Sequence, residues 1–235
     1  MVRNVFRNSQ KLLWIGSACI GTYIAYRYWK KRELLTIDEG FEEVSKIDDT
    51  HEKRVVVLGL DGAGKTSIID QISVANGDES CYTVPPKPTQ GSSVYRIKHG
   101  SFCYNVWDIG GAEATRKYWA AFLQDTDLLL FVVDASDTEK LSLAAFTLKQ
   151  LLDDVRMDSV PILVIANKQD CSNALRPEEV KKALDLLSIS PQKHKVEIMG
   201  CQTRPLPEKS TETTEYNWHH ESMDAVRKKI FSMAT

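Results

Sequence analysis

Residues 59–66 read Gly-Leu-Asp-Gly-Ala-Gly-Lys-Thr, and they follow a short apolar run, residues 54–58, that predicts a buried strand. Two glycines separated by four residues and followed by Lys-Thr, between a strand and a helix, are typical of a loop that binds phosphate. The glycines let successive backbone N–H groups point at one anion, and the next helix presents its positive end to it. We therefore predict an α/β fold in which Lys65 reaches the terminal phosphates of a nucleotide and the Thr66 hydroxyl binds magnesium. The alternative is a flexible glycine turn beside an exposed lysine.

A second motif indicates which base the nucleotide carries. The apolar run at residues 160–166 is followed by Asn167-Lys168-Gln169-Asp170. Ligands of open α/β sheets bind where parallel strands end. The Asp170 carboxylate can accept both N–H groups on the Watson–Crick edge of guanine, whereas adenine offers an acceptor nitrogen there, and an unmade charge-assisted hydrogen bond costs about 1–3 kcal/mol. The pattern favours guanine, although the same four residues alone would also suit an ordinary polar loop.

Between these motifs, residues 106–111 read Val-Trp-Asp-Ile-Gly-Gly and predict a strand that ends in a magnesium-binding carboxylate. Gly111 can bring a backbone N–H close to a γ-phosphate. Upstream, residues 88–91 read Pro-Thr-Gln-Gly, and their hydroxyl can complete a metal shell only when the third phosphate is present. The alternative for Thr89 is an ordinary loop residue. The predicted metal ligands are Thr66, Thr89 and Asp108.

Taken together, these motifs resemble the Arf/Arf-like branch of the small GTPases. The Leu-Asp-Gly-Ala filling of the phosphate loop, Trp107 before the carboxylate and Gln169 in the guanine motif are spellings of that branch. The resemblance covers residues 53–235 apart from one insertion, and it extends to the membrane-anchored Arf-like nine and ten group. It implies a P-loop small-GTPase fold with a six-stranded, mostly parallel sheet flanked by helices. It also implies GTP and GDP with Mg²⁺ as cofactors, and protein effectors that bind according to the state of two switch loops.

The resemblance also assigns the nucleotide contacts. Cys201-Gln202-Thr203 is similar to the Cys-Ala-Thr loop whose backbone recognises the guanine oxygen, and Gln202 is bulkier than the usual alanine. The residues assigned to nucleotide binding are Asp61, Gly62, Ala63, Gly64, Lys65, Thr66, Ser67, Thr89, Gly111, Asn167, Lys168, Asp170, Cys201 and Gln202.

The most consequential departure from the family pattern is Ala112, which stands where a glutamine usually orients the attacking water. A methyl group can neither donate nor accept a hydrogen bond, and phosphoryl transfer depends mainly on positioning and electrostatics. We therefore expect a guanine-nucleotide-dependent switch with weak GTP hydrolysis and assign no catalytic residue. The alternative is a GTP-bound, essentially non-hydrolysing platform that recruits partners. Glu113 is the neighbouring group that could replace the glutamine.

The surface for protein partners has changed as well. Family members grip effectors with three aromatic residues around the switches, and Trp107 and Phe122 occupy two of these positions. The third is Ser92, and Gln90 replaces an apolar residue. We expect partners of ordinary Arf proteins to bind poorly.

The amino-terminal segment predicts a membrane anchor. Residues 12–26 carry no charge, and basic residues flank the stretch 12–29, which as a helix would span about 27 Å. Tyr26, Tyr28 and Trp29 would lie at the interface. The prediction is a single-pass anchor with the nucleotide-binding domain in the cytosol, on a thin membrane such as the mitochondrial outer membrane or the endoplasmic reticulum. The alternatives are a cleaved signal peptide and a soluble packing helix.

Composition bounds the remaining possibilities. The net charge of −2 provides no basic field for nucleic acid, and five scattered cysteines without metal-ligand spacing suit a reduced cytosolic setting. The expected organisation is an anchor at 1–32, an acidic linker at 33–52 and the GTPase domain at 53–235, with an exposed insertion at 204–218. Strands are expected at residues 54–60, 93–98, 102–108, 128–134, 160–166 and 195–199, and helices after Lys65, Glu113, Thr138, Arg176 and His219.

Overall fold

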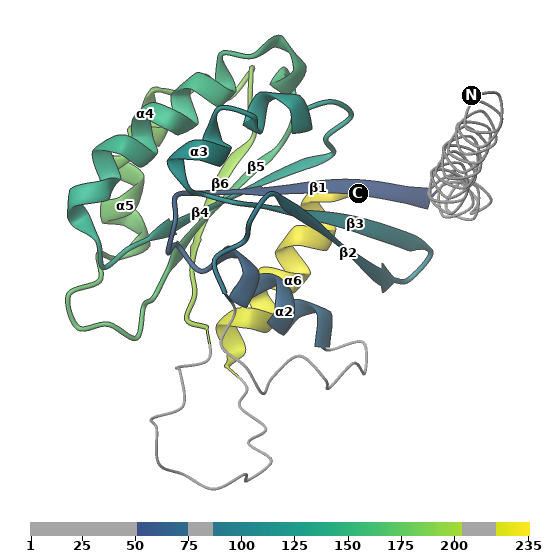
Figure 1. The fold of residues 1–235 in the computed structure, drawn as a ribbon, viewed down its shortest axis with the longest axis horizontal. Helices are drawn as coiled ribbons and strands as arrows, with labels where there is room; N and C mark the ends of the chain where they lie inside the picture. Colours follow the sequence, from purple (N-terminus) through teal and green to yellow (C-terminus); the bar gives the residue numbers. More distant parts are fainter. Residues whose placement is uncertain (1–50, 75–86, 204–219) are drawn as a thin grey trace, which may run out of the picture. The chain divides into compact units, whose positions relative to one another are not determined.

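A computed structural model describes residues 51–74, 87–203 and 220–235. Six strands form one sheet in the order β2-β3-β1-β4-β5-β6 (Figure 1). Only the pairing of β2 with β3 is antiparallel, and the other four neighbouring pairs are parallel. The predicted six-stranded, mostly parallel sheet is therefore confirmed. The strands are β1 (Glu52–Leu58), β2 (Ser92–His99), β3 (Phe102–Ile109), β4 (Leu128–Asp134), β5 (Ile162–Asn167) and β6 (Val196–Gly200).

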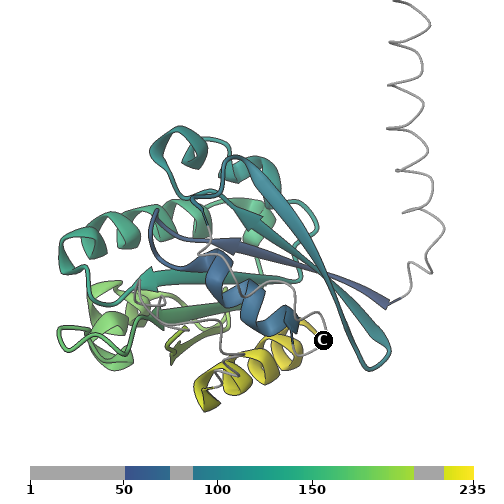
Figure 2. The same cartoon turned by 60° about the horizontal axis from the view of Figure 1, so that its bottom comes forward.

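Helices cover both faces of this sheet. Figures 1 and 2 show α2 (Lys65–Val74) and α6 (Glu221–Ala234) on one face, and α4 (Leu141–Leu152) and α5 (Pro177–Ala183) on the other. All four begin close to the predicted positions. Shorter elements complete the described chain: α3 (Glu113–Arg116) and the 3₁₀ turns η3 (Trp119–Phe122), η4 (Thr138–Lys140), η5 (Val155–Met157) and η6 (Leu186–Ser188).

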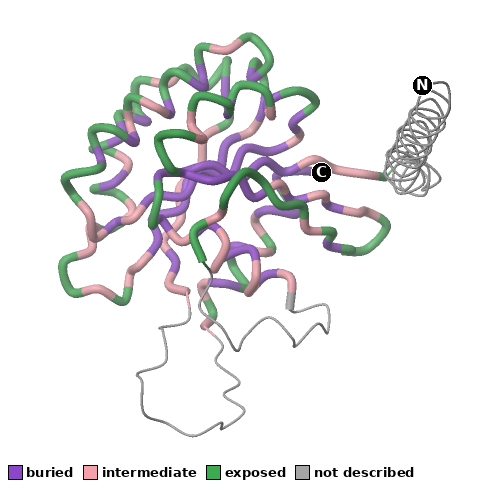
Figure 3. Tube along the Cα trace, viewed as in Figure 1, coloured by how far each residue is buried: buried purple, intermediate pink, exposed green. Residues whose placement is uncertain are grey.

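The core lies on both sides of the sheet, and the strand sequences explain why. In β1, Val55 and Val57 pack toward α2 and α6, whereas Val56 and Leu58 pack toward α4 and α5. All of these side chains are fully buried, so residues 55–58 of the strand form a continuous apolar run instead of alternating with polar residues. β4 and β5 follow the same rule, and Figure 3 shows the buried colour along the middle of the sheet.

Strand order places the functional edge. β1 lies between β3 and β4, so the chain turns to one side of β1 and later to the other, and ligands of open α/β sheets bind at the carboxyl end of such a switch point. Three polar side chains stand at that edge: Asp108 near the end of β3, Asp134 at the end of β4 and Asn167 at the end of β5. The first and third were predicted as site residues, and Asp134 was not.

Both ends of β1 lie two residues from the predicted bounds for physical reasons, whereas the other strands differ from the prediction by at most two residues. β1 begins at Glu52, inside the predicted linker, because this residue already pairs with Cys103 on β3. β1 ends at Leu58 and not at residue 60, because Gly59 has a φ of 151° and a Cβ there would lie 2.1 Å from the Val132 carbonyl oxygen. The phosphate loop therefore begins directly after Leu58.

Several predictions fall on other parts of the chain. The anchor at 12–29, the linker up to residue 50 and the insertion at 204–218 lie outside the described residues. Within the three described ranges, no helix combines the length and apolar character needed to cross a membrane.

Candidate nucleotide-binding site

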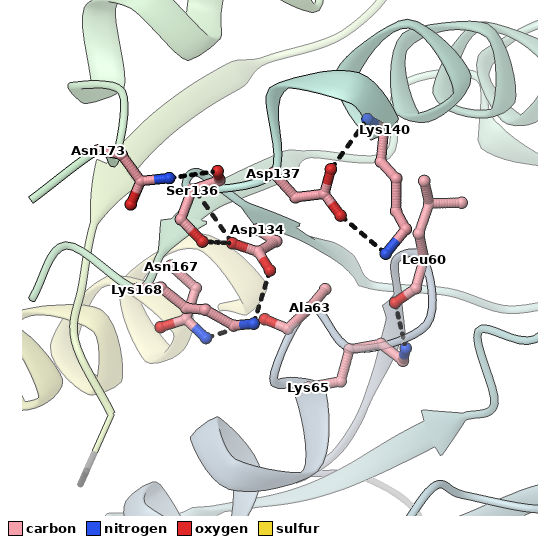
Figure 4. Close-up of polar contacts among 10 residues, drawn as sticks. All are labelled: Leu60, Ala63, Lys65, Asp134, Ser136, Asp137, Lys140, Asn167, Lys168 and Asn173. Carbon is pink, nitrogen blue, oxygen red and sulfur yellow. Dashed lines mark hydrogen bonds and ion pairs between the residues drawn. The ribbon is translucent and has the colours of Figure 1, made fainter. Parts of the chain in front are cut away.

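The lysine of the phosphate loop is held by the loop itself. The Lys65 Nζ donates to the carbonyl oxygen of Leu60 (3.1 Å; Figure 4) and to that of Gly59 (2.8 Å), and the side chain is buried. Burial lowers the pKa of Lys65, while the carboxylates of Asp108 and Asp61 act in the opposite direction. An ammonium group has three N–H donors, so one remains for an anion held by the loop.

The three predicted metal ligands meet at one point. The hydroxyls of Thr66 and Thr89 lie 2.6 Å and 3.1 Å from the Asp108 Oδ2, and 2.9 Å from each other. Two hydroxyls carry only two protons, so one of these three oxygen–oxygen contacts has no proton between its atoms. Facing oxygens without enough protons fit a cation.

Asp108 gives a second indication of the same fit. This side chain is fully buried, and its Oδ1 has no hydrogen-bond partner among the residues that the structure describes. Around it, the described chain brings no three His, Cys, Asp or Glu side chains together as a metal cluster. One carboxylate with hydroxyls and phosphate oxygens is the type of shell that Mg²⁺ takes in nucleotide sites.

Two consecutive glycines bring three loops into contact. A Cβ on Gly111 would lie 2.4 Å from the Gly59 carbonyl oxygen and 2.6 Å from the Asp61 nitrogen. A Cβ on Gly110 would lie 2.5 Å from the Thr89 carbonyl oxygen. Neither position has room for a side chain, which shows that Gly111 lies directly against the phosphate loop. A γ-phosphate contact requires this placement. The sequence motif predicted Gly111, whereas the packing role of Gly110 was missed.

The guanine motif is joined to the phosphate loop through Asn167. This buried side chain donates from Nδ2 to the Ala63 carbonyl oxygen (2.9 Å) and accepts at Oδ1 from the Cys201 thiol (3.3 Å). A Cβ on Gly64 would lie 2.3 Å from the same Nδ2, so only glycine leaves room for the amide. Asn167 therefore acts as a brace between two loops.

The other residues of the guanine motif lie beside the second predicted base loop. Asp170 is exposed, and the Gln169 backbone N–H donates to the Cys201 carbonyl oxygen (3.1 Å), which brings the two predicted base loops together. Burial, and secondarily the Asp170 charge, raises the pKa of the Cys201 thiol to about 12. The thiol therefore stays protonated and donates to Asn167.

Gln202 and the other predicted contacts lie on the same edge. Gln202 is half-buried, and its backbone N–H donates to the Ser222 hydroxyl (3.3 Å), so the loop is held by α6. Asp61 and Gly62 are exposed at the loop tip, and Ser67 is half-buried on the first turn of α2. The structure thus brings all the predicted nucleotide and metal residues to one end of the sheet.

Sequence reasoning missed a polar network between the guanine motif and β4. The Lys168 Nζ donates to the Asp134 Oδ2 (2.6 Å), and the backbone N–H and hydroxyl of Ser136 donate to the Oδ1 of that carboxylate (Figure 4). Burial acts to raise the pKa of Asp134, but hydrogen bonds from Lys168 and Ser136 outweigh it, so the pKa lies below its ordinary value. The signal available in the sequence was a carboxylate at the end of an apolar run.

The segment after the glycine pair begins with an alanine. Ala112 follows Gly111 directly, is exposed and occupies the N-cap of α3. Glu113 begins that helix and is also exposed. The Trp119 Nε1 donates to the Gly110 carbonyl oxygen (2.9 Å), which fixes the segment just before Ala112.

Comparison with known proteins agrees with the geometry. Residues 41–215 match the model of the ADP-ribosylation factor family. ADP-ribosylation factor-like protein 3 of Chlamydomonas reinhardtii is 42% identical over 138 residues, which is 59% of this chain and 75% of the relative. ADP-ribosylation factor-like protein 2 of Dictyostelium discoideum is 36% identical over 168 residues, covering 72% of this chain and 84% of the relative.

A solved structure shows the same arrangement of elements. The Arl6 (BBS3) small GTPase from Trypanosoma brucei, with the bound nucleotide analogue GppNp, superimposes with a TM-score of 0.57 and 28% identity. The match covers 64% of this chain and 87% of that protein. The family model matches residues 41–215, which is more than half of this chain. The chain therefore belongs to the ADP-ribosylation factor family, as an Arf-like small GTPase of the GTP-binding switch type.

Proposed function

We propose that this chain binds GTP and GDP with Mg²⁺ and hydrolyses GTP slowly, while anchored in a membrane. Lys65 and the loop N–H groups would hold the phosphates, and Thr66, Thr89 and Asp108 would hold the cation, which stabilises negative charge on the phosphates when bound. Asp170 would select guanine. The observation that carries the slow hydrolysis is Ala112, an exposed methyl group at the position where the attacking water needs a polar partner.

The surroundings of Ala112 support this step. Gly111 packs on the phosphate loop and Trp119 fixes Gly110, so the next residue is held near the terminal-phosphate end of the site. A polar side chain there would orient water, and Ala112 leaves this water without a protein hydrogen bond. Positioning accounts for a large part of phosphoryl-transfer catalysis, so the expected loss is about a hundredfold or more.

The test is gain of function. Ala112→Gln should raise the single-turnover rate of GTP hydrolysis at least about tenfold, while leaving GTP affinity within about twofold. Glu113→Gln is the control, because it places the same amide group one residue later, and it should not raise the rate of GTP hydrolysis. If this substitution lowers the rate instead, Glu113 itself positions the attacking water. Fast hydrolysis by the unmodified protein would contradict the proposal.

The second candidate is a platform that remains GTP-bound and recruits partners continuously. Thr89 favours this candidate. Its hydroxyl contacts the Thr66 hydroxyl and the Asp108 carboxylate, which is the position expected for a metal ligand in the GTP-bound state. Nucleotide extracted from the purified protein distinguishes the two. Mostly GTP supports the platform, mostly GDP supports a cycling switch, and no guanine nucleotide contradicts both.

Effector binding would use the aromatic pair near the switches. The rings of Trp107 and Phe122 lie 6.0 Å apart, and the Arg54 guanidinium covers the Trp107 ring at 4.1 Å. With Ser92 exposed where an aromatic residue usually stands, the apolar contact area is smaller than in the family pattern. Effectors specific to this chain would therefore depend on Trp107, and Trp107→Ala should abolish their GTP-dependent capture.

The membrane part of the proposal rests on the uncharged stretch at residues 12–26 and its basic flanks. The full chain should resist alkaline extraction from mitochondrial outer or endoplasmic reticulum membranes, and Ile20→Arg should release it, since a charge in mid-span costs about 2.5–3.5 kcal/mol. Protease added to intact organelles should digest the nucleotide-binding domain if it faces the cytosol. Protection from protease, or extraction of the unmodified chain, would contradict this placement.

A further inference from the structure

We infer that Asp134 is a positioning residue of the nucleotide site and that it acts through Lys168. The inference rests on the proposed guanine-nucleotide binding and adds a residue outside the sequence motifs. Register supplies the first step: Asp134 on β4 lies level with Asn167 on β5, so the carboxylate stands beside the first residue of the guanine motif. Lys168 follows immediately, with a left-handed φ of 63° that turns the chain out of the strand.

The second step is the fixed orientation of the carboxylate. The Asp134 Oδ1 accepts from the Ser136 backbone N–H (2.9 Å) and hydroxyl (2.6 Å), which leaves Oδ2 for the Lys168 ammonium at 2.6 Å. Both carboxylate oxygens are occupied, and the side chain is only 15% exposed, compared with 35% for Lys168. A charge-assisted contact of this length holds an otherwise flexible lysine in one position.

The third step ties this pair to the surrounding loops. The Asn173 Nδ2 donates to the Ser136 carbonyl oxygen (3.0 Å) (Figure 4). The Ala135 backbone N–H donates to the Asn167 carbonyl oxygen (3.1 Å). Because Asn167 also holds Ala63 of the phosphate loop, the network links both halves of the nucleotide site. Asp134 therefore determines where the Lys168 side chain lies beside the base pocket.

A matched ion pair at the other end of the same strand provides the control. Asp127, just before β4, pairs with Lys53 at 3.1 Å, and its second oxygen accepts from the Arg54 backbone N–H (2.7 Å). This pair also joins an aspartate to a lysine on a neighbouring strand segment. It lies at the end of the sheet opposite the phosphate loop, so Asp127→Asn removes the same kind of interaction without touching the site.

The experiment measures dissociation of fluorescent GDP in Mg²⁺ from four variants: Asp134→Asn, Lys168→Met, the double variant and Asp127→Asn. We expect dissociation about tenfold faster for each single site variant, no further acceleration in the double variant, and a change under twofold for Asp127→Asn. Additive effects in the double variant would overturn the inference, because Asp134 would then act independently of Lys168. An unchanged rate for Asp134→Asn would also overturn it.

Two further measurements separate the possible failures. If the unmodified protein retains no guanine nucleotide, the proposed function fails; if it does but the cycle is additive, only the role of Asp134 fails. Should Asp134→Asn not fold, Ser136→Ala replaces it, because this variant keeps the ion pair and removes one of the two hydrogen bonds to the Asp134 Oδ1. It should accelerate dissociation about threefold in the Lys168 background and not in the Lys168→Met background; equal effects in both would contradict the inference.

Discussion

The part of the site that holds a nucleotide and the part that would position water differ sharply in how much protein surrounds them. Lys65 and Asp108 are buried, and Thr66 and Thr89 converge on the same carboxylate oxygen. Ala112 is exposed and has no polar group. On our proposal, binding and hydrolysis are therefore separate properties of this fold: binding requires a built cradle, whereas fast hydrolysis depends on a polar side chain at the position of Ala112.

The largest expected effect comes from a substitution in the part of the site that holds the nucleotide. Asp108→Asn removes the negative charge on which the Thr66 and Thr89 hydroxyls converge, so Mg²⁺-dependent GTP affinity should fall about a hundredfold or more. Titration calorimetry with GTP and Mg²⁺ checks this. Asp158→Asn, at an exposed pair with Lys193, is the control and should leave affinity unchanged. Equal affinity in the Asp108 variant would contradict the assignment of the metal site.

The next effect concerns the brace between the loops. Gly64 has a φ of 88° and no room beside Asn167, so Gly64→Ala should lower the unfolding free energy by about 2 kcal/mol or more and also weaken nucleotide binding. Gly100→Ala is the matched control, because Gly100 also has a positive φ, but an added Cβ meets nothing within 4 Å. It should cost about 1–2 kcal/mol from backbone strain alone. Urea unfolding of both variants gives the comparison, and similar losses would show that the contact with Asn167 has no weight.

A smaller effect is a change in acid stability. The pKa of Asp134 is lower in the folded protein than its ordinary value, so this carboxyl stabilises the fold above its unfolded pKa and the contribution is lost as pH falls through the folded pKa. Asp134→Asn should therefore be less stable than the unmodified protein at pH 6, and the difference should shrink below about pH 4. Urea unfolding at several pH values measures it. A difference that stays constant from pH 6 to pH 3 would mean that the carboxylate charge is not involved.

The smallest effect is chemical. With a pKa near 12, the Cys201 thiol is protonated at any physiological pH, and only the thiolate reacts with alkylating reagents. Native protein treated with iodoacetamide at pH 8 should be labelled at half-buried Cys171 and not at Cys201, as peptide mass spectrometry would show. Labelling of Cys201 in the folded state would place the thiol outside the contact with Asn167.

The sequence predicted the holding part of the site because its residues come in spaced motifs. Lys65 and Thr66 follow a glycine pattern, and Asp108 and Asn167 each end an apolar run, so strand order alone brings them to one edge. Asp134 also ends an apolar run but belongs to no motif, and its role depends on register with β5 and on a side-chain contact. The close approach of Gly110 to Thr89 was hidden for the same reason, since distant loops meet only after the sheet forms. The anchor and the insertion, which lie outside the described residues, stay predictions.

The fate of bound GTP in the unmodified protein tests the central claim most directly. Protein loaded with GTP and Mg²⁺ is freed of excess nucleotide, and the bound GTP and GDP are separated at intervals over several hours. Our account predicts that GTP stays bound and that its hydrolysis is slower than about 10⁻⁴ s⁻¹. Prompt conversion to GDP would contradict the proposal that this chain holds GTP and cleaves it only slowly.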